Sequence, residues 1–247
     1  MKVILNGALG KMGAEVSKLL EKTDSGATLA AGIDVAAVEG GNVYRALTDY
    51  SGDADVIMDF SHHACTSELT SYAVSRKLPL VVATTGQTEA ELEMIKAAAK
   101  YIPVFLSANM SLGIAALADF ARRAAALMPD ADIEIVEKHH NQKLDAPSGT
   151  ALLLADAIKE SRGDVPVVCG RSGHAKREKG EIGISSLRLG GVVGEHEVIL
   201  ATEKETITLS HSAHDRALFA EGAIAAAKFI VGKPAGLYDM RSLVSGD

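Results

Sequence analysis

The segment VEKHHNQKLDAPSGTA, residues 136–151, combines the residue types that move a proton with those that attract an anion. His139 and His140 are adjacent, and Lys143 follows three residues later. A histidine has an ordinary pKa of about 6.5, so it can act as a general acid near neutral pH. The lysine adds a full positive charge beside it. The segment is therefore a candidate site for giving a proton to an anionic substrate.

The same segment ends in a helix start. Ser148 or Thr150 can cap the apolar run ALLLADAIKE, which has helical character, and Pro147 gives an extended approach to it. The backbone N–H groups at such a start bind carboxylate or phosphate, and Gly149 lets the anion come close. A capped helix preceded by two surface histidines is the alternative interpretation, and the residue pattern alone leaves both open.

A strand is predicted immediately before the histidines. In DIEIVEKHH, the apolar residues Ile133, Ile135 and Val136 stand against Glu134 and Glu137. This pattern is typical of a strand with at least one packed face. The histidines therefore come at the end of a strand.

A glycine turn near the N-terminus predicts a nucleotide site. The apolar run KVILNG is followed by a helical pattern, with Gly7, Gly10 and Gly13 at the turn between them. The spacing is G-x-x-G-x-x-G, and such glycines let the backbone approach a pyrophosphate at the helix start. An ordinary strand–helix turn is the alternative for the glycines alone.

An acidic residue supports the nucleotide interpretation. Asp34 ends the strand pattern ATLAAGID, 21 residues after Gly13, where a carboxylate can bind the adenosine ribose. It repels a 2′-phosphate, and Val35 offers no cation to offset this, so NADH is the expected cofactor. Lys11 can reach a phosphate or simply face water, so NADPH stays possible.

The pattern of strand and helix continues to about residue 110. Strands are predicted in 54–61, 78–86 and 102–111, and helices in 63–77 and 88–101, where Thr88 and Glu91 can form a capping box. The alternation predicts a parallel doubly wound sheet, whose ligands bind beyond the carboxyl ends of the strands. ATTG (83–86) and SANM (107–110) are therefore expected beside the nicotinamide, with an ordinary turn as the alternative for each. His62 and His63 also follow a strand, either near the cofactor or as exposed loop residues.

Composition narrows the function classes. The chain of 247 residues carries a net charge of −7, has 4% aromatic residues and contains no Trp, which disfavours nucleic-acid binding. Cys65 and Cys169 are expected to be reduced thiols. No signal-peptide pattern and no apolar run of about 20 residues is seen, so a cytoplasmic protein without membrane contact is expected.

EKHHNQKLDAPSGTA closely resembles the signature E-x-H-H-x-x-K-x-D-A-P-S-G-T-A of the 4-hydroxy-tetrahydrodipicolinate reductases. NGALGKMG resembles the cofactor loop of that family, and SANMSLG its A-x-N-[FM]-S-x-G motif. ATTG resembles G-T-T-G, with Ala83 in place of a glycine. GGVVGEHEV and FAEGAIAAAKFIVGKPAGLYDM match its C-terminal third, so the resemblance covers essentially the whole chain.

The resemblance implies two domains. Residues 1–110 would form an α/β Rossmann-like dinucleotide-binding domain, completed by 220–247. Residues 111–219 would form an α+β substrate-binding and oligomerisation domain with a mixed open sheet, and its strands would support a homotetramer. The β-branched residues and glycine turns of 181–214 independently predict strands there.

The implied reaction is a reduction by NAD(P)H in the diaminopimelate route to lysine. A hydride goes to C4 of a cyclic imine dicarboxylate, water is lost from the 4-hydroxy form, and the enamine takes a proton at C3. By resemblance, His139 donates that proton and Lys143 is the second catalytic group. Four residues would bind the substrate: His140, Ser148, Gly149 and Thr150. The cofactor would be lined by Gly7, Leu9, Gly10, Lys11, Met12, Asp34, Ala83, Thr84, Thr85, Ser107, Asn109 and Met110. No metal is implied.

Some features leave alternatives open. Ala83 adds a methyl group where the family has glycine, and Val35 stands where some members carry an arginine. Glu195 and His196 can approach the substrate or form a structural turn, and Arg216 is a similar case. Two rival functions stay open: another dehydrogenase of the same architecture, and a non-catalytic NAD(H)-sensing protein.

Overall fold

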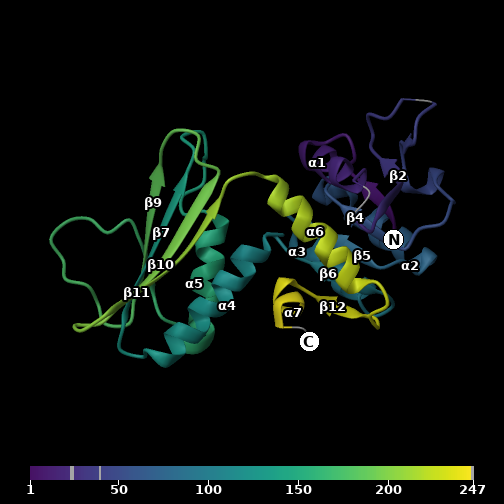
Figure 1. The fold of residues 1–247 in the computed structure, drawn as a ribbon. Coiled ribbons are helices and arrows are strands. Elements are labelled where there is room, and N and C mark those ends of the chain that lie inside the picture. Colours follow the sequence, from purple (N-terminus) through teal and green to yellow (C-terminus); the bar gives the residue numbers. More distant parts are fainter. Residues whose placement is uncertain (23–24, 39, 246–247) are drawn as a thin grey trace. The chain divides into compact units, whose positions relative to one another are not determined.

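The chain folds as two compact units in the computed structural model, which describes residues 1–22, 25–38 and 40–245 (Figure 1). One unit contains Met1–Ser111 and the segment from Ala217 onward, and the other contains Leu112–Arg216. Each unit has its own hydrophobic core. Within the described residues, no helix has the length and apolar character that crossing a membrane requires.

The first unit is built on a seven-stranded sheet in the order β12-β6-β5-β4-β1-β2-β3. All neighbouring strands are parallel. The order reverses between β1 and β4, as in nucleotide-binding doubly wound sheets, so the predicted Rossmann-like fold is confirmed. The strands are β1 (Lys2–Asn6), β2 (Thr28–Ile33), β3 (Val43–Tyr44), β4 (Val56–Asp59), β5 (Leu80–Val82), β6 (Pro103–Leu106) and β12 (Gly236–Tyr238).

Helices cover both faces of this sheet because alternate strand residues are apolar on each side. Ile4, Ile57 and Leu80 share a core with Leu69 of α2 and Ile95 of α3. The helices α1 and α6 pack together, and α6 also packs on β4, β5 and β6 (Figure 1). The helices are α1 (Lys11–Leu20), α2 (Thr66–Arg76), α3 (Glu89–Ala98), α6 (Ala217–Ile230) and α7 (Met240–Ser245), with short 3-10 turns at Leu47–Asp49 and His63–Cys65.

The predicted capping box at the start of α3 is confirmed. The Thr88 hydroxyl accepts the Glu91 N–H at 3.3 Å, and the Glu91 carboxylate accepts the Thr88 N–H at 2.7 Å. Two N–H groups that the helix cannot pair internally are thereby satisfied.

The second unit packs two helices against one face of a mixed five-stranded sheet (Figure 1). The strand order is β11-β10-β7-β9-β8, with antiparallel pairs from β11 to β7 and parallel pairs from β7 to β8. The predicted mixed sheet is therefore confirmed. Its elements are α4 (Leu112–Leu127), β7 (Asp132–His139), α5 (Gly149–Arg162), β8 (Val167–Cys169), β9 (Ile182–Arg188), β10 (Gly194–Ala201) and β11 (Thr206–Ala213).

Strand β7 carries an acidic residue into the interior. Ile133, Ile135, Glu137 and His139 are all buried, because side chains two residues apart share a face of the sheet. The expectation that Glu137 stands opposite the isoleucines is wrong, whereas Glu134 does lie on the other face. The buried face of β7 thus begins apolar and ends in two titratable groups.

The close approach of α1 to the turn after β1 requires glycine at Gly13. A Cβ there would lie 2.1 Å from the Gly7 carbonyl oxygen, a backbone atom that cannot move aside alone. We expect Gly13→Ala to lower the free energy of unfolding by about 1–3 kcal/mol, although alanine favours a helix interior by about 1 kcal/mol. Urea unfolding of the full chain measures this loss.

Gly41→Ala is the matched control, because a Cβ at Gly41 would meet its nearest atom at 3.9 Å. Its effect should stay within about 0.5 kcal/mol. Equal stability of the Gly13 variant and the wild type would contradict the close packing of α1 on the turn.

Candidate active site

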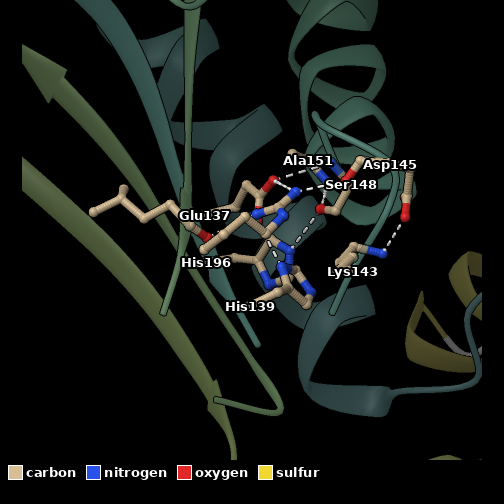
Figure 2. A network of polar contacts seen from close by, with 9 residues as sticks. Glu137, His139, Lys143, Asp145, Ser148, Ala151 and His196 are labelled. Carbon is tan, nitrogen blue, oxygen red and sulfur yellow. Dashed lines mark hydrogen bonds and ion pairs between the residues drawn. The ribbon is translucent and has the colours of Figure 1, made fainter. Parts of the chain in front are cut away.

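A fully buried carboxylate, Glu137, joins the functional residues of the second unit (Figure 2). Arg188 donates to both of its oxygens, at 2.8 Å and 2.7 Å. His139 Nδ1 lies 2.5 Å from Oε2, and the Ser148 N–H donates to Oε1 at 3.1 Å. One side chain of β7 therefore contacts β9, the histidine two residues along and the start of α5.

The Glu137 carboxylate is ionised over the physiological pH range. Burial by itself raises the pKa of a carboxyl group, but hydrogen bonds from Arg188 and His139 outweigh it and lower the pKa of Glu137 to about 2. The sheet register brings these groups together, since His139 pairs with Arg188 across β7 and β9. The buried charge is thus matched by a bidentate guanidinium.

A second buried histidine, His196, contacts Ser148 at the start of α5. His196 pairs with Glu137 across β10 and β7, and its Nε2 is 3.1 Å from the Ser148 hydroxyl. That hydroxyl also accepts the Ala151 N–H at 3.1 Å, which is the predicted cap of α5. The rings of His139 and His196 meet edge to face, with centroids 5.2 Å apart. The Ser148 N–H therefore contacts Glu137, and the Ser148 hydroxyl contacts His196.

His196 is neutral at physiological pH, because burial, assisted by the nearby His139, lowers its pKa to about 4. The arrangement that leaves fewest buried polar groups unsatisfied has the Ser148 hydroxyl donating to Nε2. The His196 Nδ1 then carries the proton. It is buried and has no hydrogen-bond partner within the described part of the chain.

The loop between β7 and α5 supplies the positive charge. Lys143 Nζ lies 2.8 Å from a carboxylate oxygen of Asp145 (Figure 2), and the Asp145 carbonyl accepts from Arg188 at 2.6 Å. Gly149, the first residue of α5, is exposed, and a Cβ there would meet no atom within 4 Å. An anion can therefore approach the backbone N–H groups of this helix start.

The six predicted catalytic and substrate residues all belong to this region. His139 ends β7, His140 follows it, Lys143 lies in the loop, and Ser148, Gly149 and Thr150 form the start of α5. Glu195 is 3.1 Å from Lys138 on the opposite face of the sheet, and Arg216 is exposed at the end of the unit. Within the described residues, no group of three potential ligands is arranged to hold a metal ion.

Sequence reasoning missed Glu137 and Arg188, which complete the network, and it left the role of His196 open. Strict alternation along β7 already places Glu137 beside His139. No local pattern could find the others, because Arg188 is 51 residues from Glu137 and His196 is 48 residues from Ser148. They meet only through the sheet register.

The predicted cofactor residues lie in the first unit, at the carboxyl ends of its strands. Gly7 has a φ of +80°, and a Cβ there would lie 2.5 Å from the Phe60 carbonyl oxygen. Gly10 precedes α1 and makes no side-chain cap hydrogen bond. No capping side chain of Gly10 therefore competes with a bound phosphate for the N–H groups of the first turn, at Lys11 and Met12. The Asp34 carboxylate accepts the Leu9 N–H at 3.0 Å and the Ala36 N–H at 3.0 Å.

The loops after β5 and β6 are held by backbone contacts. The N–H groups of Ala83 and Thr84 donate to the Asp59 carbonyl at 3.0 Å and 3.2 Å, and Thr85 is exposed. The Ser107 hydroxyl donates to the Asn109 carbonyl at 2.8 Å, and Met110 is buried behind that turn. These loops come at the strand ends where a parallel sheet binds its ligand.

The two uncertain loop histidines have different environments. His63 Nδ1 lies 3.0 Å from the carboxylate of Glu91, which caps α3, whereas His62 is exposed. His63 thereby ties the loop after β4 to the helix that follows ATTG.

The glycine turn and the acid after β2 fit a dinucleotide. The turn leads into the backbone N–H groups at the start of α1. The Leu9 N–H of the same turn donates a hydrogen bond to the Asp34 carboxylate. Together with the strand order, these features define the class of Rossmann-like dinucleotide-binding proteins.

Comparison with known proteins identifies the family within that class. The family description "Dihydrodipicolinate reductase, N-terminus" matches residues 1–110, and "Dihydrodipicolinate reductase, C-terminus" matches residues 113–244. The chain belongs to the dihydrodipicolinate reductase family, and the resemblance inferred from its motifs is confirmed.

Relatives match over almost their whole length. The 4-hydroxy-tetrahydrodipicolinate reductase of Caldanaerobacter subterraneus subsp. tengcongensis is 46% identical over 247 residues, covering 99% of this chain and 98% of the relative. The enzyme of the same name from Clostridium tetani is 42% identical, covering 99% and 97%. The structure of dipicolinate-bound dihydrodipicolinate reductase from Paenisporosarcina sp. TG-14 is 25% identical, covers 97% of each chain and has a TM-score of 0.80.

The buried neutral His196 predicts a pH-dependent stability. Its pKa is about 4 in the fold, below the ordinary 6.5, so the unfolded chain takes up the proton first as the pH falls. Its contribution is complete above pH 6.5 and is lost between pH 6.5 and 4, on the order of 3 kcal/mol. Urea unfolding across this range measures the loss.

His196→Gln is the comparison, because a glutamine oxygen can still accept from Ser148 but does not titrate. The variant should lose less stability than the wild type between pH 6.5 and 4. Parallel pH dependence of the two proteins would show that His196 is not held neutral by the fold.

Proposed function

We propose that this chain reduces 4-hydroxy-tetrahydrodipicolinate, with loss of water, to tetrahydrodipicolinate, in the diaminopimelate route to lysine. The observation that carries the proposal is the joining of His139 to the start of α5 through Glu137. A proton donor is thereby fixed to an anion site, as reduction of an imine dicarboxylate requires. The names of the relatives support this substrate.

The reaction is numbered here from the imine carbon as C2. Loss of the C4 hydroxyl and a C3 proton as water gives a C3=C4 bond conjugated with C2=N. The glycine turn and Asp34 of the first unit would hold a reduced nicotinamide nucleotide, which would supply the hydride to C4 and so leave an enamine. His139 then gives its proton to C3, and the C2=N bond forms again.

The anion site holds the substrate carboxylates. Backbone N–H groups at Gly149 and Thr150 donate hydrogen bonds to one carboxylate at the positive end of α5, and Lys143 and His140 lie beside it. Ser148 shapes this site by fixing the first turn of the helix. Lys143 exchanges Asp145 for the substrate or bridges the two, and it assists the departure of the hydroxyl.

NADH is the proposed preferred cofactor. Each Asp34 oxygen accepts one backbone N–H and retains a lone pair for a ribose hydroxyl, while its charge repels a 2′-phosphate. Val35, 85% exposed, offers no cation to that phosphate. Lys11 is exposed in the first turn of α1 and is the one predicted cofactor residue that can favour NADPH.

A cytoplasmic homotetramer is the proposed state of the enzyme. The family resemblance supports the assembly, and β11 supports it too, because this long edge strand is mostly exposed and offers unpaired backbone groups. The free cysteines Cys65 and Cys169 suit a reducing compartment.

His139→Ala tests the proton donor. We expect kcat to fall by about 10²–10⁴-fold, because placed proton transfer contributes that much, while KM changes little. The assay follows NADH oxidation with substrate made in situ by the preceding synthase. His174→Ala, at an exposed loop residue, is the control and should retain wild-type kcat.

A His139→Ala enzyme with nearly full kcat would disprove the assignment of the donor. A wild-type protein that binds NADH but oxidises neither NADH nor NADPH with this substrate would disprove the reductase itself.

Asp34→Ala tests the cofactor preference. Loss of the ribose acceptor should raise KM for NADH by roughly tenfold, about 1.4 kcal/mol, and should raise KM for NADPH less, because the repulsion of its phosphate also disappears. Asp53→Ala, at a side chain 93% exposed, is the control. An equal rise for both cofactors would place the discrimination elsewhere, with Lys11 the next candidate.

A further inference from the structure

Glu137 is more deeply buried than the histidine it contacts. Its side chain is fully enclosed, whereas 8% of His139 is exposed. Their contact, from Nδ1 to Oε2 at 2.5 Å, leaves only the other ring nitrogen of His139 for an external partner. Gly194 lies beside that nitrogen, because a Cβ there would be 3.1 Å from Nε2. The β10 backbone can approach Nε2 closely only with glycine at this position.

The direction of the hydrogen bond follows from charge. An ionised carboxylate can only accept, so His139 Nδ1 must donate to Glu137. Neutral His139 then carries its proton on Nδ1 and a lone pair on Nε2, and a second proton taken up from solvent or substrate goes to Nε2. The imidazolium so formed stays paired with the carboxylate.

We propose that Glu137 is a positioning residue of this enzyme, which fixes the His139 tautomer so that Nε2 delivers the proton, and which ties that imidazole to the anion site through the Ser148 N–H. The inference rests on the proposed function, since it assumes that His139 is the donor. It assigns a role to a residue that touches neither substrate nor cofactor.

Arg188 makes this arrangement possible. Both of its terminal nitrogens bind Glu137, and one also donates to the Asp145 carbonyl in the loop that carries Lys143. A buried carboxylate without such a partner would take up a proton, and a protonated Glu137 could donate to Nδ1 and invert the tautomer. Arg188 therefore keeps Glu137 an acceptor.

The other charged groups around His139 do not compete for Nδ1. His196 approaches from β10 edge to face and is neutral. Lys143 and His211 are near enough to His196 to lower its pKa further, and Asp145 is paired with Lys143. Among the described residues, Glu137 is the carboxylate in hydrogen-bond contact with His139.

A double-mutant cycle tests the proposal on the full-length enzyme. Glu137→Gln should lower kcat by about 10–100-fold, as loss of an orienting partner does. In the His139→Ala background, the same substitution should lower kcat by less than about threefold, because no imidazole remains to be oriented. An undiminished loss in that background would overturn the proposal, since it would show a merely structural role.

Glu134→Gln is the matched control. Glu134 lies on the same strand and also pairs with an arginine, Arg177, but it faces the other side of the sheet. Its substitution should leave kcat and the pH profile unchanged. In Glu137→Gln, by contrast, kcat should fall, because the imidazole has lost the carboxylate that orients it.

A measurement independent of activity separates the two proposals. Nitrogen-15 spectra of neutral His139 should show a protonated Nδ1 in the wild type and a mixture of tautomers in Glu137→Gln. If the wild type shows this signature but reduces no substrate, the proposed function fails and the role of Glu137 in fixing the tautomer stands. If the wild type is active but His139 is protonated on Nε2, the positioning role fails alone.

Discussion

The second unit depends on the burial of one charge, the carboxylate of Glu137. An unpaired ion in a protein interior costs several kcal/mol, so the fold must bring compensating donors to it. Arg188 arrives from β9, His139 from β7 itself and the Ser148 N–H from α5. These contacts form only when the parallel register of β7 and β9 and the start of α5 are all correct. The contacts that balance the buried charge therefore also fix the geometry of the site.

The first unit also buries a carboxyl group, Asp59, for which the described residues form no ion pair, and the direction of its pKa shift is opposite to that of Glu137. Asp59 ends β4 at the reversal of strand order, where it accepts hydrogen bonds from Asn6 at 2.9 Å and the Ser61 hydroxyl at 2.6 Å. Burial raises the pKa of Asp59, because its effect outweighs that of these hydrogen bonds. Burial thus shifts the pKa of Asp59 upward beside the nucleotide turn, whereas the paired Glu137 keeps a lowered pKa beside His139.

Features that depend on residues close together in the sequence could be predicted. Features that depend on the pairing of distant strands could not. The glycine turn, Asp34 and the Thr88–Glu91 box follow from short spacings, and all are present as predicted. No element is predicted from the sequence at Leu112–Leu127, although Ile114, Leu117 and Ala121 recur there at helical spacing and are buried. The residue pattern leaves His196 open between a substrate contact and a structural turn, and only the pairing of β10 with β7 buries it beside Ser148. Such contacts depend on strand register, which one sequence does not specify.

Neutron diffraction from a deuterium-exchanged crystal, grown slightly above neutral pH, would test the role of Glu137 most directly. We predict deuterium on Nδ1 of His139, none on either Glu137 oxygen, and the Ser148 deuterium directed at Nε2 of His196. Deuterium on Glu137, or on His139 at Nε2 alone, would contradict the account, because the carboxylate would then not hold the imidazole in the tautomer that delivers a proton from Nε2.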